Sequence, residues 1–297
     1  MTRAEQSGAI EFELAFKGSV NRWECDENDH LNVRFYSRMV GESLANALSG
    51  WQVPAGWRIL IQHMRYLAEA RMATPVSGYV ALVNSTEASF DVLTELRHSF
   101  TGVVLAAFLS RVRCGQHGLG AMEPLPLPAH AGPRGLPMDD TSYSRLTLSE
   151  APTHGFQIIA KGIVAHAECD ARGELPPHGI MGRVSDGMPN LWAILQSAEE
   201  QSARASGFQG GAVLEYRMHY HAFPKAGDRY ELVSGVRDVT EKLQYFTHLL
   251  YDVRTGQCIM SAEAVGVVLD LVARRSVTIS PERRARMLAI RLKPHAS

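Results

Sequence analysis

The order of apolar and polar segments predicts two similar units in this chain. In the first unit, a β-prone run at 10–20 is followed by a polar segment at 24–32. Apolar residues then recur at helical spacing from Tyr36 to Leu48, which predicts one long helix. Strand-like runs separated by turns that carry Pro or Gly complete the unit, at 57–68, 79–85, 90–100 and 103–114.

The second unit repeats this order. A strand is predicted at 155–164, a polar segment follows at 168–178, and a helix is predicted from about 190 to 205. Four strands and a short closing helix are predicted at 212–221, 229–238, 243–252, 257–269 and 281–290. The tripeptide Glu-Cys-Asp occurs at the same point of both units, so we interpret the chain as a tandem duplication.

A segment rich in proline and glycine separates the two units. We therefore predict a first unit at 1–117, a linker at 118–152 and a second unit at 153–297. The predicted fold class is α+β, with each unit a curved antiparallel sheet wrapped round one long helix. Pairing the units covers the sheet edge and helix region that each leaves open, which predicts an intrachain pseudo-dimer.

Composition excludes several classes of protein. The chain has 297 residues, of which 45% are apolar, and its net charge of −1 gives no general attraction to nucleic acid or to an anionic membrane. Its N-terminus does not have the pattern of a secretory signal, and no run approaches the length of a membrane span. Four cysteines without a CxxC pair favour a reduced, cytoplasmic setting, and the scattered histidines predict no metal site.

The candidate chemistry lies in the first polar segment, just before the predicted helix. Asp26, Asn28, His30 and Asn32 recur at every second residue, so in an extended segment they project to one side. Free backbone N–H groups at a helix start stabilise an oxyanion, and a carboxylate beside them can activate water. Each residue alone is typical of a helix cap, but the four together favour a catalytic site.

The stretch WECDENDHLNVRFY resembles the signature of the hotdog-fold thioesterase superfamily. The Cys-Asp pair resembles the 4-hydroxybenzoyl-CoA thioesterase type, which implies Asp26 as the catalytic carboxylate. The spacing of Asp26, Asn28 and His30 resembles that of acyl-ACP thioesterases, in which the three act together. The stretch RYLAEAR resembles the family's second strand and implies that Glu69 assists. The resemblance implies two tandem hotdog units.

Further residues of the helix start complete the predicted site. We expect backbone N–H groups near Asn32, Val33 and Arg34 to hold the thioester carbonyl oxygen, and Tyr36 to contribute to substrate binding. No metal or redox cofactor is required by this chemistry.

The second polar segment departs from the pattern. Asp170 is retained, but Arg172, Glu174 and Pro176 stand where the first unit has Asn28, His30 and Asn32. We therefore expect Asp170 to be a turn residue and the second unit to stabilise the first; a separate site at His178 and Asp186 is the less favoured interpretation. The run Arg283-Arg284-Ala285-Arg286 is interpreted as a solvated helix face, with a nucleotide phosphate as the alternative ligand.

The expected function is hydrolysis of an acyl thioester, with acyl-CoA as the leading substrate. An acyl-ACP substrate, a non-hydrolytic acyl-binding module and a dehydratase are the alternatives. Homo-oligomerisation remains open, as does the identity of the acyl chain.

Overall fold

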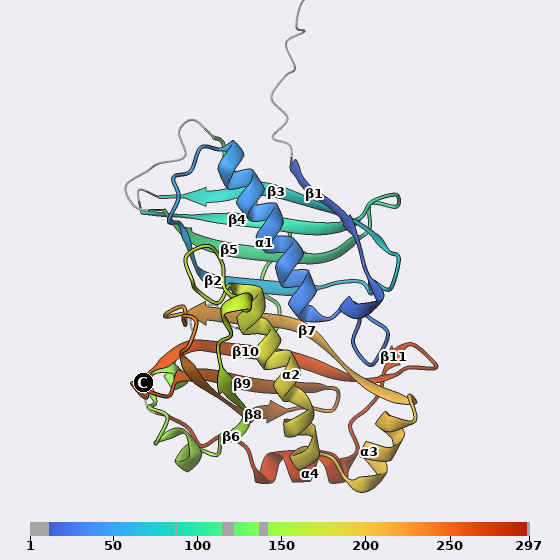
Figure 1. Cartoon of the computed structure of the whole chain (residues 1–297). Coiled ribbons are helices and arrows are strands. Elements are labelled where there is room, and N and C mark those ends of the chain that lie inside the picture. Colours follow the sequence, from blue (N-terminus) through green and yellow to red (C-terminus); the bar gives the residue numbers. More distant parts are fainter. Residues whose placement is uncertain (1–11, 87, 115–121, 137–141, 296–297) are drawn as a thin grey trace, which may run out of the picture.

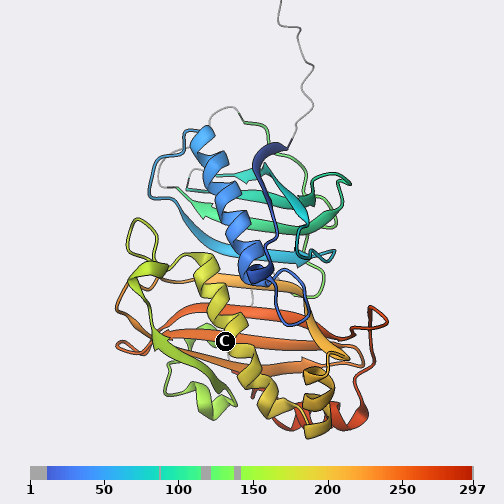
Figure 2. The ribbon, with the colours of Figure 1, turned by 45° about the vertical axis from the view of Figure 1, so that its right-hand side comes forward.

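The computed structural model describes residues 12–86, 88–114, 122–136 and 142–295. Its two halves form one continuous antiparallel sheet in the order β1-β3-β4-β5-β2-β7-β10-β9-β8-β6, with β11 paired to β10. The halves join where β2 pairs with β7, and the two long helices cross the same face of the sheet (Figures 1 and 2). The predicted pseudo-dimer is therefore present within one chain.

The first half follows the predicted order closely. Helix α1 (Val33–Gly50) buries its apolar face, including Met39, Val40 and Leu44, against the sheet. A short 3-10 turn, η1 (Arg22–Glu24), precedes it. The strands are β1 (Glu13–Ser19), β2 (Arg58–Tyr66), β3 (Pro75–Ser85), β4 (Ser89–His98) and β5 (Val104–Arg113).

The second half repeats this arrangement but corrects the predicted helix at 190–205. The long helix α2 (Pro177–Leu195) begins directly after the polar segment, and α3 (Ala198–Ala205) is a separate helix capped by Ser197 and Glu200. The closing helix is α4 (Pro281–Ala289). The strands are β6 (Gln157–Ile163), β7 (Gln209–Tyr220), β8 (Arg229–Val239), β9 (Leu243–Asp252), β10 (Cys258–Asp270) and β11 (Arg275–Ser276); further 3-10 turns are η2 (Ser142–Arg145), η3 (Ala151–His154) and η4 (His166–Glu168).

The duplication extends to individual hydrogen bonds. Asn46 on α1 donates to the Ala15 carbonyl of β1 at 2.8 Å, and Asn190 on α2 donates to the Ile159 carbonyl of β6 at 2.7 Å. The ion pairs between α1 and η1 and between α2 and η4 have the same length, 2.6 Å, and join Arg38 to Glu24 and Arg183 to Glu168. Equivalent residues of the two halves make the same contacts, although they are far apart in sequence, because both halves fold in the same way.

The proline-rich segment crosses the face of the sheet away from the long helices. Side chains alternate along a strand, and Met64 and Tyr216 belong to the core under the helices, so their neighbours His63 and Glu215 point to the other face. There, Glu215 accepts hydrogen bonds from the backbone N–H groups of Arg134 and Gly135 at 3.0 and 2.8 Å. Residues 118–121 and 137–141 of the predicted linker lie outside the described residues. Among the described residues, no helix has the length and apolar character needed to cross a membrane.

Candidate active site

A tight turn fixes the carboxylate of Asp26 just before α1. One oxygen, Oδ1, accepts hydrogen bonds from the backbone N–H groups of Asn28 at 2.9 Å and His30 at 3.2 Å. Asp29 takes the left-handed conformation, with φ of 60°, that closes this turn. The other oxygen, Oδ2, accepts no hydrogen bond from the described residues, so it remains available to a ligand.

Asp170 forms the same turn in the second half. Its Oδ1 accepts from the N–H groups of Arg172 at 2.8 Å and Glu174 at 3.2 Å. The two carboxyls nevertheless differ electrostatically. Burial raises the pKa of Asp26, against the two backbone hydrogen bonds. Burial also acts to raise the pKa of Asp170, but its hydrogen bonds and the neighbouring Arg172 outweigh burial and lower it. This fits the expected role of Asp170 as a turn residue.

Asn28 and Asn32 connect the first polar segment to the second half. The Asn28 amide donates to the Gly211 carbonyl of β7 at 3.3 Å, and the Asn32 amide donates to Ser185 Oγ of α2 at 2.8 Å. A Cβ added at Gly210 would overlap the Asn28 amide oxygen, so this close approach requires glycine. Both amides therefore hold the two halves together at the site.

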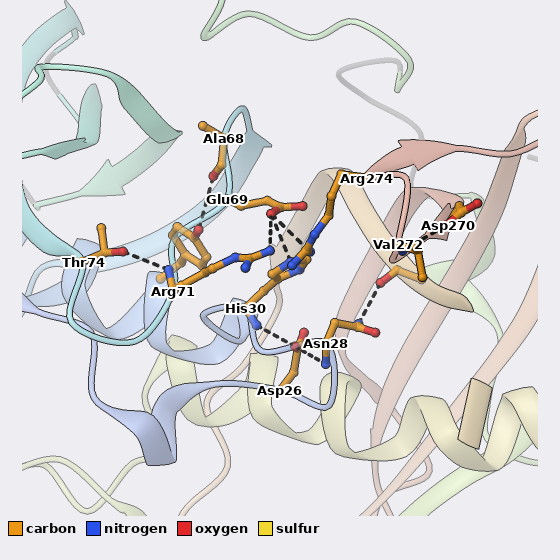
Figure 3. A network of polar contacts seen from close by, with 12 residues as sticks. Asp26, Asn28, His30, Ala68, Glu69, Arg71, Thr74, Asp270, Val272 and Arg274 are labelled. Atoms are coloured by element: carbon orange, nitrogen blue, oxygen red, sulfur yellow. Dashed lines mark hydrogen bonds and ion pairs between the residues drawn. The ribbon is translucent and has the colours of Figure 1, made fainter. Parts of the chain in front are cut away.

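The side chain of His30 turns away from Asp26 and contacts Glu69, a predicted site residue that lies just beyond the end of β2. His30 Nε2 lies 3.2 Å from Glu69 Oε2 and 2.7 Å from the guanidinium of Arg274, in the turn between β10 and β11 (Figure 3). Because an arginine only donates hydrogen bonds, the contact with Arg274 makes Nε2 the acceptor, and the Glu69 carboxylate is bound by Arg274 at 3.4 Å rather than by the ring. Arg274 was not predicted from the sequence, because no local motif marks it.

The helix start offers fewer free donors than expected. The Asn32 N–H donates to the Glu24 carbonyl at 2.9 Å, and the Arg34 N–H donates to the Asn32 side-chain oxygen, also at 2.9 Å. Asn32 is therefore an N-cap, which satisfies one of the groups predicted to hold the oxyanion. Among the described groups near residues 32–34, only the Val33 N–H remains without a partner.

These residues border a cavity of about 340 Å³ between the first polar segment and the second half. All of the predicted site residues line it except Arg34, whose side chain packs against Gly182 of α2. Neither His178 nor Asp186 lines it, and neither does Asp170. Among the described residues, no group of three His, Cys, Asp or Glu side chains could hold a metal ion.

Most of the cavity wall comes from the second half, which the sequence analysis did not anticipate. Trp192 of α2 packs edge-on against Phe246 of β9, with ring centroids 5.5 Å apart. His248 lies further along the same strand face, 6.1 Å from the Tyr216 ring of β7. The alternation of Gln244, Phe246 and His248 is the one sequence signal that could have indicated a common face of β9.

Comparison with known proteins connects this site to a family. Residues 20–133 match the sequence model of the Thioesterase-like superfamily, so the predicted resemblance is confirmed for the segment that holds Asp26 and Glu69. No curated protein sequence matches the chain.

Solved structures share the two-unit fold. A Lactobacillus plantarum protein assigned as an oleoyl thioesterase has a TM-score of 0.63 and 11% identity, covering 87% of this chain and 96% of its own. An acyl-ACP thioesterase from Bacteroides thetaiotaomicron has a TM-score of 0.56 and 12% identity, covering 84% and 96%. The 12:0-ACP thioesterase from Umbellularia californica has a TM-score of 0.56 and 9% identity, covering 86% and 93%. The chain thus has the double hotdog fold.

Proposed function

We propose that this double hotdog protein, whose first half carries the pattern of the Thioesterase-like superfamily, hydrolyses acyl thioesters to a carboxylic acid and a free thiol. The observation that carries the proposal is the position of Asp26. Its carboxylate is fixed through one oxygen, its pKa is raised by burial, and it borders the large cavity between the halves. A carboxyl of raised pKa in a cleft is typical of a general base.

In the proposed reaction, Asp26 removes a proton from a water molecule as the water oxygen bonds to the thioester carbonyl carbon. The negative charge that develops on the carbonyl oxygen is stabilised by the free Val33 N–H at the start of α1. The C–S bond then breaks, and the leaving thiolate takes up the proton. Direct attack by Asp26 is the alternative, and single-turnover hydrolysis in heavy-oxygen water distinguishes the two by labelling of the Asp26 carboxyl.

His30 and Glu69 act beside this centre rather than as a relay to Asp26. The His30 ring accepts a hydrogen bond from Arg274, which also binds Glu69, and His30 lines the cavity. We assign to His30 the orientation of the water or of the thioester, with Arg274 fixing the ring and Glu69 holding Arg274. Asn28 and Asn32 have a positioning role, since their amides bind Gly211 and Ser185 of the second half.

Acyl-CoA is the leading carrier, and acyl-ACP is the second candidate. The second candidate is favoured by the fold likeness to two proteins named as acyl-ACP or 12:0-ACP thioesterases. Hydrolysis of one acyl group presented on both carriers, at equal concentration, separates the candidates by the ratio of kcat/KM.

The test of the function is steady-state hydrolysis of a panel of acyl-CoA and acyl-ACP thioesters with detection of the released thiol. Asp26→Asn should lower kcat by about 100- to 10,000-fold, the usual contribution of a general base. Asp170→Asn is the matched control, because it changes the same turn away from the cavity. It should retain kcat within a few-fold.

Three outcomes contradict the proposal. Equal loss of activity in both variants would assign the effect to the turn rather than to catalysis. A wild-type protein that binds acyl thioesters without releasing thiol would support the acyl-binding module, and hydration of an enoyl thioester would support the dehydratase.

A further inference from the structure

Arg283 is the unpaired member of the buried arginines. Three arginines in the described part of the chain are buried: Arg65, Arg217 and Arg283, which is 6% exposed. Arg65 donates to the Gly132 carbonyl at 2.9 Å, and Arg217 forms an ion pair with Glu263. The Arg283 guanidinium has neither a hydrogen bond nor an ion pair within the described chain. Arginine is almost never buried in proteins without a partner, so this site is incomplete as it stands.

The position of Arg283 indicates where its partner would lie. The residue is in the first turn of α4 and lines the same cavity as Asp26. The nearby carboxylate of Glu200 is already bound by Arg286 and by the Ser197 N–H. Burial lowers the pKa of Arg283, and so do the charges of Arg286 and Arg204, while Glu200 opposes them. A guanidinium nevertheless remains charged in proteins, so a positive charge faces the cavity.

Other polar atoms in the lining of the cavity also lack partners. Gln244 Oε1 and His248 Nε2 are both buried, both residues line the cavity, and neither atom has a hydrogen bond to the described residues. Ser234 lies 2.6 Å from the other ring nitrogen of His248, Nδ1. The cavity is therefore less apolar than a pocket for a plain hydrocarbon chain would be.

We propose that the acyl group of the substrate carries a carboxylate at its far end and that Arg283 binds this carboxylate. The substrates would then be thioesters of dicarboxylic acids. A carboxylate matches the planar fork of a guanidinium with two parallel hydrogen bonds. The buried position favours this small anion over the phosphates of a carrier, which are bulky and remain hydrated. The inference rests on the proposed function for the identity of the substrate, but the binding itself does not require hydrolysis.

Calorimetric binding of thioester mimics to the full chain tests the inference without catalysis. The ligands are amides that replace the thioester: the monoamide of a dicarboxylic acid, which keeps the far carboxylate, and the amide of the monocarboxylic acid of the same chain length, which has no carboxylate. Wild type should bind the monoamide of the dicarboxylic acid about 10- to 100-fold more tightly, and Arg283→Met should abolish that difference. Arg284→Met is the matched control, because Arg284 lies on the same helix without lining the cavity. It should keep the preference, and Arg283→Lys should restore part of it.

Equal affinity of wild type for the two amides overturns the inference, even if acyl thioesters are hydrolysed. A preference that depends on Arg283 in a protein that hydrolyses nothing supports the inference and contradicts the proposed function. Thermal unfolding excludes a merely structural role. Loss of a structural arginine would lower the midpoint, whereas replacing an unpaired buried charge by methionine should raise the midpoint of the empty protein.

The carrier phosphates are the other source of an anion, and kinetics separates the two. Thioesters of N-acetylcysteamine lack phosphate. If Arg283→Met lowers kcat/KM for a dicarboxylic thioester on this short carrier as much as on CoA, the acyl carboxylate is the ligand. If the loss occurs only with CoA and for every acyl group, the phosphate is the ligand and the inference is wrong.

Discussion

Two aspartates in equivalent turns have pKa values shifted in opposite directions. Asp26 and Asp170 each accept two backbone hydrogen bonds of nearly equal length, which stabilise the charged form. The difference comes from the surroundings. Asp170 has Arg172 beside it, whereas Asp26 is more deeply buried and borders the cavity between the halves. The raised pKa of Asp26 thus reflects its site and not its turn.

This difference predicts opposite effects on stability. A carboxyl whose pKa is raised in the folded state lowers the stability when it ionises. Asp26→Asn should therefore raise the unfolding midpoint at neutral pH. This gain in the midpoint should disappear as the pH falls below the raised pKa of Asp26. A carboxyl whose pKa is lowered adds stability above its ordinary pKa, so Asp170→Asn should lower the midpoint at neutral pH and have little effect in acid. Thermal unfolding of both variants from pH 3 to 8 measures this. Shifts of the same sign would contradict the assignment.

At the scale of elements, the site depends on how closely β7 approaches the first polar segment. Two glycines follow Gln209 at the start of β7, and Gly210 leaves the space that the buried Asn28 amide fills. The small residues at the start of this strand therefore contribute both to the contact between the two halves and to the wall of the cavity.

Replacement of these neighbouring glycines should separate the two roles. Gly210→Ala displaces the Asn28 amide and should lower kcat/KM by about 10- to 100-fold, because small misplacements at a reacting centre are costly. At Gly211 the nearest atom to an added Cβ is 3.9 Å away, so Gly211→Ala should change kcat/KM less than threefold by the usual tolerance of ordinary contacts. Similar kinetics of the two variants would refute this function of Gly210.

The sequence predicted strands better than it predicted helix α2. Strands β8, β9 and β10 begin within a residue of their predicted positions, because each apolar run is bounded by turn residues. Helix α2 begins at Pro177 instead of near 190. The sequence did not predict its first part because the glycines and Pro189 lower helical propensity. Packing overrides that propensity: Gly182 admits the Arg34 side chain, and Gly187 admits Ile159 of β6.

The same distinction applies to the site. The segment from Asp26 to Asn32 was recognisable because its residues are adjacent in sequence, and Glu69 because of a family pattern. Arg274 and Arg283 were not, because only the folded chain brings them to the cavity. The interpretation of the Arg283 run as a solvated face is wrong for Arg283 itself, which helical periodicity turns inward with Met287.

At the scale of the whole molecule, the Glu215 side chain of β7 connects β2 and the proline-rich segment where the two halves meet. Its carboxylate lies 2.6 Å from His63 Nε2 of β2 and accepts two N–H groups of the proline-rich segment. Burial opposes ionisation, but His63 and the two N–H groups lower the pKa of Glu215 to about 2. A charged group is thus used to join the halves and the linker in one place.

Glu215→Gln should lower the free energy of unfolding at pH 7 by about 2–4 kcal/mol, as expected when one partner of a buried pair is removed. The contribution of Glu215 is complete above its ordinary pKa of 4.5 and is lost as the pH falls toward about 2, so the two proteins should converge in acid. Denaturant unfolding measures the difference. Asp91→Asn, which breaks a pair with Arg111 inside the first half, is the control and should cost roughly 1 kcal/mol or less. If Glu215→Gln destabilises the protein no more than Asp91→Asn does, Glu215 does not join the halves and the linker as described.

Covalent fusion of the halves has an evolutionary consequence. In a homodimer of single units every substitution is imposed twice, so a change that improves one interface position can damage its symmetry mate. Here the two copies mutate independently. The first could keep a reactive carboxylate while the second lost His and Asn from its own turn, and the second gained α3 and α4, which have no counterpart in the described first half. Selection could thus shape the reacting end and the recognising end of one cavity in separate steps.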